Sequence, residues 1–88
     1  MIKPTIKNLT SVSVDICKAC TKSQTIPPNV EMPIITTLKS FCHGHSSIGS
    51  FIIARYGEKD YDYKAWGNIE LRLITTIDSC TFEITEKK

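Results

Sequence analysis

Alternation of apolar and polar residues with a period of two constrains the fold of this chain more than any other feature. The stretch 69–77, IELRLITTI, places an apolar residue or threonine at every second position, with Ile74 as the exception, and stretches 11–16 and 80–85 alternate in the same way. Successive side chains of a β-strand point to opposite faces, so this pattern indicates half-buried strands. Nowhere do apolar residues keep the spacing of an amphipathic helix over three turns.

The residue types support the same fold class. Ile, Val and Thr together number 26, whereas Ala and Leu together number 7. β-branched side chains suit a pleated surface and lose rotamer freedom in a helix. We therefore expect residues 1–88 to form one all-β domain, a small antiparallel β-sandwich of about six or seven short strands.

Individual strands can be placed along the chain. We expect strands over 12–16, 34–41, 51–56, 69–77 and 80–85, with the first ten residues as a further edge strand. Pro27 and Pro28 lack backbone donors, which predicts a loop or a sheet edge over 18–29, and HGHSSIGS at 43–50 predicts a turn. The last two strands predict a hairpin, with a tight connection at 78–79 and four inward core residues: Leu71, Leu73, Phe82 and Ile84.

Charge and targeting signals narrow the function. The net charge of +2 is small, and the basic residues form no long run, so we do not expect nucleic acid as a partner. The start MIKPTIKN has no signal-peptide layout, and no window of the sequence is apolar enough to span a membrane. The chain is then either a cytoplasmic protein or the mature domain of a secreted one.

The stretch 59–68, KDYDYKAWGN, holds two tyrosines and the only tryptophan among charged and turn residues. In one interpretation it is a strand whose tyrosines close one end of the core, with the tryptophan filling a gap. In the other, Tyr61, Tyr63 and Trp66 form an exposed aromatic cluster at a loop tip. Such rings, apolar with a polar handle, suit a membrane interface or the face of a sugar.

The cysteines and histidines form a second pattern. The spacing of Cys17, Cys20, Cys42 and His45 is that of a Cys3His zinc site, in which two short turns each supply two ligands. Two alternatives stay open: disulfide bonds in an oxidising compartment, and reduced cysteines that pack as small apolar residues. Cys80 lies on the apolar positions of its strand and is expected not to bind metal in any of these cases.

Enzymatic activity is not expected. Cys42 is adjacent in sequence to His43 and close to His45, whereas a nucleophile and its base usually come from different elements. Asp60 and Asp62 lie among lysines and are expected to be solvated charges rather than a catalytic acid pair.

Several short motifs occur along the chain between Ile6 and Asn68. They are Asn8-Leu9-Thr10, Thr25-Ile26-Pro27-Pro28, Ser40-Phe41-Cys42-His43-Gly44, Gly49-Ser50-Phe51 and Trp66-Gly67-Asn68. In this order they resemble the layout of the aegerolysins and related small insecticidal β-sandwich toxins. That resemblance implies a sandwich that docks on membrane lipids through exposed aromatic residues, often with a partner protein that supplies the pore.

The sequence thus favours a binding module of toxin or effector type. It would bind a membrane lipid or a glycan through Tyr61, Tyr63 and Trp66, without a cofactor, and could form oligomers on binding. The alternatives are a zinc-stabilised protein-interaction domain using the Cys3His set, and a disulfide-stapled secreted effector that binds a protein.

Overall fold

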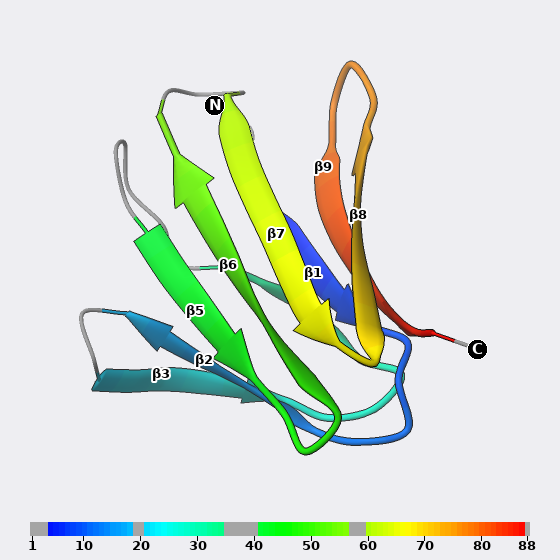
Figure 1. Cartoon of the computed structure of the whole chain (residues 1–88). Coiled ribbons are helices and arrows are strands. Elements are labelled where there is room, and N and C mark those ends of the chain that lie inside the picture. Colours follow the sequence, from blue (N-terminus) through cyan, green and yellow to red (C-terminus); the bar gives the residue numbers. More distant parts are fainter. Residues whose placement is uncertain (1–3, 19–20, 35–40, 57–59, 88) are drawn as a thin grey trace.

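The computed structural model describes residues 4–18, 21–34, 41–56 and 60–87. Within them the chain forms nine strands and no helix, so none that could cross a membrane, and the expected all-β class is confirmed (Figure 1). The strands are β1 Thr5–Asn8, β2 Val14–Lys18, β3 Thr21–Ile26, β4 Glu31–Pro33, β5 Phe41–His45, β6 Gly49–Arg55, β7 Tyr61–Gly67, β8 Ile69–Thr75 and β9 Cys80–Glu86.

The nine strands form two sheets. One sheet has four strands in the order β4-β1-β9-β8, and the other has five in the order β3-β2-β5-β6-β7. Antiparallel pairing dominates, as expected, but β1 and β9 pair in parallel. The strand number exceeds the expectation because segments 21–26, 31–33 and 41–45 also pair as strands. From the sequence, 21–26 was expected in a loop or sheet edge, 31–33 in no strand, and most of 41–45 in a turn.

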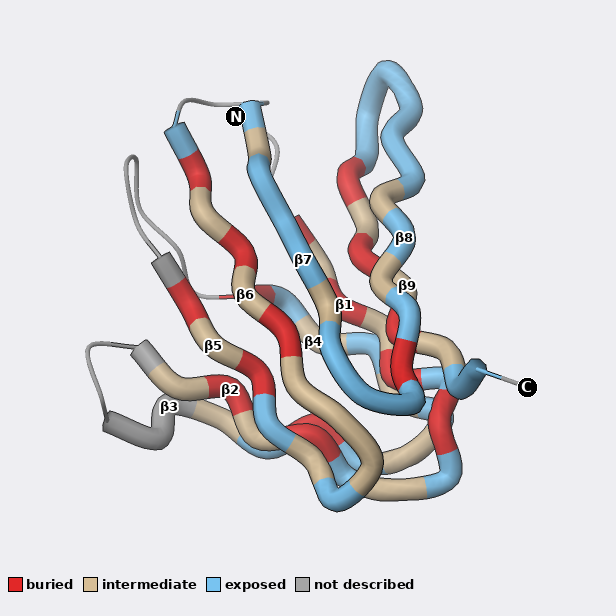
Figure 2. Tube along the Cα trace, viewed as in Figure 1, coloured by how far each residue is buried: buried red, intermediate tan, exposed pale blue. Residues whose placement is uncertain are grey.

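The two sheets share one hydrophobic core. In β6 and β9 the buried residues fall at every second position, as the period of two requires (Figure 2). Phe82 of β9 is fully buried, and the rings of Tyr61 and Tyr63 from β7 in the other sheet meet it edge-on. The buried apolar side chains of this core are Ile6, Val14, Ile16, Ile26, Ile34, Cys42, Phe51, Ile53, Ile69, Phe82 and Ile84.

The hairpin predicted near the end of the chain is present as β8 and β9. Leu71 pairs with Ile84 and Leu73 with Phe82, so the four predicted core residues face the same side. Phe82 and Ile84 are fully buried, whereas Leu71 and Leu73 pack against the core while half-buried. β8 ends at Thr75, two residues earlier than predicted, because Thr76–Ser79 form the turn of the hairpin. Ile77 in this turn is 85% exposed.

The turn predicted over 43–50 is wrong for most of that stretch. β5 continues to His45 and β6 begins at Gly49, and the short turn between them is held by Ser46, whose Oγ accepts hydrogen bonds from the amides of Ile48 and Gly49 at 3.3 and 3.2 Å. A glycine inside a strand weakens it, but here the ring of Phe51, the cross-strand partner of Gly44, covers the glycine. A Cβ at position 44 would overlap that ring.

Prolines mark one edge of each sheet. β3, which ends just before Pro27, is an edge strand of the five-stranded sheet, and β4, which contains Pro33, is an edge strand of the four-stranded sheet. The sequence predicted a loop or a sheet edge over 18–29, and the position of β3 confirms the sheet edge. Most of the strand predicted over 34–41 lies outside the described residues.

A single residue separates β7 from β8, although the two strands belong to different sheets. Gly67 has a φ of 83°, a conformation that favours glycine, and a Cβ there would approach Gly49 Cα to 2.8 Å. The next residue, Asn68, donates its amide to Ile48 O at 2.8 Å and accepts from Lys87 N at 2.8 Å. The corner is therefore bonded both to the turn before β6 and to the end of β9.

Asn8 ties the two sheets together at the end of β1. Its side chain is fully buried, and Nδ2 donates to Val12 O at 2.8 Å and to Ile26 O at 2.9 Å. Oδ1 accepts from the amide and the hydroxyl of Thr10 at 3.0 and 2.6 Å. Because Ile26 ends β3, this amide connects the four-stranded sheet, the loop after β1 and the five-stranded sheet.

Replacing this amide tests its structural role. We expect Asn8→Ala to lower the free energy of unfolding by about 2–4 kcal/mol, since it leaves buried polar groups without their partner. Urea denaturation followed by circular dichroism measures the change. The matched control is Asn68→Ala on an exposed side chain, expected to stay within about 0.5 kcal/mol. Equal effects of the two variants would contradict the assigned role.

Glu86 makes a second link, between the end of β9 and the loop before β2. Its Oε1 accepts from both the amide and the hydroxyl of Ser11 at 2.6 Å. These hydrogen bonds, first the one from the hydroxyl and then the one from the amide, lower the pKa of the Glu86 carboxyl. A lowered pKa in the folded state means that the ionised form stabilises the fold above the unfolded-state pKa.

The stability contributed by Glu86 should therefore depend on pH. We expect Glu86→Gln to lower the melting temperature at neutral pH, because the carboxylate is the stronger acceptor. The difference from the parent protein should disappear as the pH falls through the folded-state pKa, which lies below the usual glutamate value of about 4.3. Glu70→Gln, on an exposed carboxylate of β8, controls for the change in net charge. A difference that persists at low pH would show that Ser11 does not recognise the charge.

Candidate functional site

The outer face of the five-stranded sheet carries several apolar side chains. On β6, Phe51 and Ile53 point into the core, so Ile52 and Ala54 lie on the opposite, outer face. The register pairs Ser50 with Trp66, Ile52 with Lys64 and Ala54 with Asp62, and directly paired residues share a face. Trp66, Lys64 and Asp62 of β7 therefore extend from the same outer surface.

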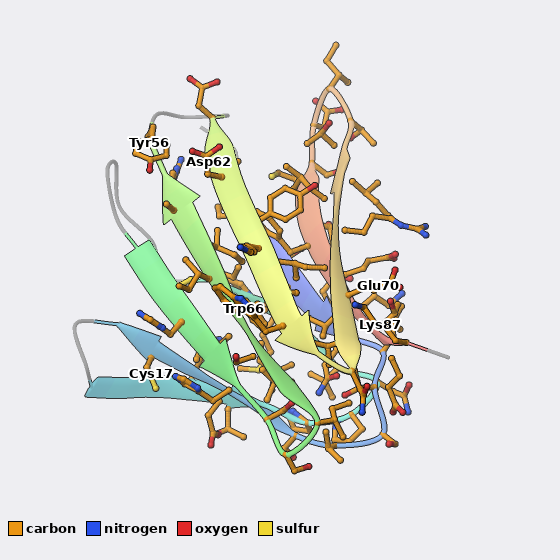
Figure 3. All side chains as sticks on the ribbon, viewed as in Figure 1. Cys17, Tyr56, Asp62, Trp66, Glu70 and Lys87 are labelled. Atoms are coloured by element: carbon orange, nitrogen blue, oxygen red, sulfur yellow. The ribbon has the colours of Figure 1, made fainter. Side chains whose placement is uncertain are left out.

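These side chains border a shallow groove, which we call the outer groove, with a volume of about 310 Å³. Trp66 is 42% exposed and Tyr56 is 60% exposed, and Figure 3 shows them with Asp62 along β6 and β7. The Lys64 ammonium lies 5.5 Å from the centre of the Trp66 ring, within the range of a cation–π contact. The lining residues are Ile52, Ala54, Tyr56, Asp62, Tyr63, Lys64 and Trp66.

The three aromatic residues singled out in the sequence do not form one cluster. The rings of Tyr61 and Tyr63 lie 5.2 and 5.6 Å from that of Phe82, so both tyrosines face the core side of β7. Tyr63 is nevertheless 42% exposed and also borders the outer groove, whereas Tyr61 packs against the core. Trp66 lies on the other side because its position has the opposite parity. The strand interpretation of this stretch therefore fits the tyrosines, but the tryptophan does not fill a gap in the core.

Tyr61 sits in an unusual environment at the core end of β7. Its hydroxyl is buried beside the thiol of Cys80. Burial raises the pKa of this phenol, and so does the neighbouring thiol of Cys80; the Arg55 guanidinium, 5.8 Å from the ring centre, opposes the increase. Tyr61 therefore packs against the core, with its ring edge-on to Phe82.

The sequence analysis missed Tyr56, Ile52 and Ala54 as site residues. Their signal was present, because residues 51–56 are apolar on both parities until Arg55. That pattern is typical of a strand covered on both faces. Within the described residues, however, only the inner face of β6 is covered, by the core shared with the four-stranded sheet, and the apolar positions of its outer face border the outer groove.

The structure does not bring the predicted Cys3His ligands together. Cys42 is buried on the inner face of β5, whereas His45, three residues later, lies on the outer face, as does Cys17 opposite His43. Cys20 lies outside the described residues. In the described part of the chain, no group of three or more His, Cys, Asp or Glu side chains is arranged to hold a metal ion, and no disulfide joins Cys17, Cys42 and Cys80.

Known proteins give no guide to this site. Comparison with protein families, with curated protein sequences and with solved structures finds no match to the chain. The outer groove must therefore be interpreted from its own residues, which combine an aromatic platform, an aliphatic floor and one charge of each sign. Such a surface can stack against a flat ligand and form hydrogen bonds at the rim.

The two positions of the aromatic residues predict different costs of truncation. We expect Phe82→Ala to lower the free energy of unfolding by about 3–5 kcal/mol because it opens a cavity in the shared core. Trp66→Ala should cost about 1 kcal/mol, the span of intrinsic strand preferences, because its ring is half in solvent. Chemical denaturation of the two variants measures both values, and a similar large cost for both would place Trp66 in the core.

Proposed function

We propose that this chain is a non-enzymatic binding module built as a β-sandwich, and that its outer groove binds a glycan. One observation carries the proposal: the half-exposed ring of Trp66 stands over an aliphatic floor, with Asp62 and Lys64 beside it. An exposed aromatic ring beside apolar and charged side chains offers a ligand both a stacking surface and hydrogen-bonding partners.

The chemistry of sugars matches this surface. A pyranose ring presents C–H groups on its faces, which pack on an indole, and hydroxyl groups around its edge, which form hydrogen bonds. Asp62 can accept such hydrogen bonds, and Lys64 can donate them. Burial of about 100 Å² of apolar surface would contribute about 2.5 kcal/mol, so a single module would bind weakly and several copies together would bind tightly.

A glycan fits the groove better than a membrane lipid, the other partner favoured by the sequence. Docking in a bilayer interface would require the Trp66 ring to enter the headgroup region together with the Asp62 carboxylate, and a desolvated carboxylate is costly. The ring also extends from the face of a sheet, next to Lys64 on β7, rather than from a loop tip. Membrane docking, which the aegerolysin resemblance implies, is the second candidate that the experiment must separate.

The proposal is tested with the tryptophan as reporter. The protein is first screened against immobilised neutral and acidic oligosaccharides, and each ligand found is titrated in solution while the emission of Trp66, the only tryptophan, is followed. We expect saturable binding with a blue shift as the ring leaves water. Trp66→Ala should cost about 2 kcal/mol of binding energy, which is about 30-fold in affinity.

Two controls make the result specific. Ile77→Ala removes an exposed apolar side chain from the β8–β9 turn, outside the outer groove, and should leave glycan affinity unchanged. Sedimentation with phosphatidylcholine vesicles, with and without phosphatidylserine, measures lipid binding in the same samples. Vesicle binding that requires Trp66, without glycan binding, would overturn the proposal in favour of a membrane-docking toxin or effector.

A further inference from the structure

His43 and His45 form a pair on the same outer sheet face. They are two residues apart on β5, so both imidazoles extend from one side of the strand. Their rings are parallel to within 6°, and the ring centres are 5.8 Å apart. The sequence analysis, which assigned 43–50 to a turn, had no reason to place these two rings together.

The neighbouring strand β2 contributes two further polar side chains to this pair. The register places Cys17 directly opposite His43 and Asp15 directly opposite His45. Directly opposite residues of an antiparallel pair have Cβ atoms about 4.5–5.5 Å apart, which is within reach of a shared ligand. The Asp15 carboxylate is held by the hydroxyl of Thr25, which donates to Oδ1 at 2.7 Å.

The ring separation suits a shared metal ion. With metal–nitrogen bonds of about 2.0–2.1 Å, two imidazoles on one tetrahedral ion have ring centres about 5 Å apart. The observed separation of 5.8 Å is close to that value. As they stand, these side chains are not arranged around an ion. The two rings are stacked instead of converging, so binding requires the exposed His45 and the half-buried His43 both to rotate about their side-chain torsions.

From this placement we propose that His43 and His45 bind one divalent transition-metal ion of the Zn²⁺ and Co²⁺ class, with Cys17 as the third ligand. Imidazole and thiolate are the ligands that such borderline ions prefer. Asp15 is placed to orient the His45 imidazole, as carboxylates beside metal-binding histidines do. His45 is exposed and His43 and Cys17 are half-buried, so an ion can reach the site from solution.

This site differs in three residues from the set expected from the sequence, and each difference can be tested. It includes His43, which the Cys3His spacing left out, and it excludes Cys42, whose side chain is buried on the opposite face of β5. Cys20, which lies outside the described residues, belongs only to the set expected from the sequence.

Co²⁺ is the probe, added alone to the full chain. Its visible absorption reports tetrahedral binding, and a thiolate-to-cobalt band in the near ultraviolet reports a cysteine ligand; competition with Zn²⁺ then gives the zinc affinity. We expect saturable binding of one ion per chain. Loss of a residue that only hydrogen-bonds to a metal ligand lowers metal affinity by about 10–100-fold. His43→Ala and His45→Ala each remove a ligand itself, so we expect each to lower the affinity by at least that factor.

The cysteine variants complete the test. Cys17→Ser should remove the near-ultraviolet band, whereas Cys42→Ala and Cys20→Ser should leave both band and affinity unchanged. Far-ultraviolet circular dichroism of each variant establishes that it is folded. No saturable binding, or unchanged affinity in His43→Ala, would overturn the proposal. Loss of binding in folded Cys42→Ala or Cys20→Ser would replace it with the Cys3His set, and an unchanged band in Cys17→Ser would remove Cys17 from the site.

Discussion

The corner at Gly67 and Asn68 fixes how the two sheets of this protein face each other. With only Asn68 between β7 and β8, these strands must occupy adjacent edges of the two sheets. Hydrogen bonds from the corner to Ile48 and Lys87 hold it to both sheets. The left-handed conformation that this requires at Gly67 is available to glycine at little cost. Together with the buried amide of Asn8, the corner sets the geometry on which the core depends.

The corner also decides which face of β7 is buried. Because β8 brings β9 and its Phe82 alongside, Tyr61 and Tyr63 turn their rings toward the four-stranded sheet. Successive side chains of a strand alternate between faces, so this choice places Asp62, Lys64 and Trp66 on the outer surface. The two edge-on contacts with Phe82 therefore turn Tyr61 and Tyr63 away from Trp66, although Tyr63 stays 42% exposed and also borders the outer groove.

The outer face of the five-stranded sheet gathers both sites proposed for this chain. The register aligns Asp15, His45, Ser50 and Trp66 in one row across four neighbouring strands. Strands in a sheet lie about 4.7–4.9 Å apart, so His45 and Trp66 are about 10 Å from each other along this row. The inner face of the same strands is apolar and covered, which leaves the outer face for ligand chemistry.

Local pattern was sufficient for much of the fold. The alternation in 69–77 and 80–85 determined the β8–β9 hairpin and the direction of Leu71, Leu73, Phe82 and Ile84, because period and direction are properties of a single strand. The abundance of β-branched residues determined the all-β class, and the prolines determined that β3 lies at an edge. The tertiary structure was needed to show that His43 lies in a strand, since Gly44 there depends on the ring of Phe51 from the neighbouring strand.

The candidate sites followed the same division. The sequence identified Trp66, Cys17 and His45 as residues of interest, but it could not separate Trp66 from Tyr61 and Tyr63 or Cys42 from His45. It also could not show that Tyr56 joins the groove or that His43 joins His45. The reason is physical: alternation within a strand fixes which side chains share a face, but contact with the opposite sheet decides which face is covered and which stays open to a ligand.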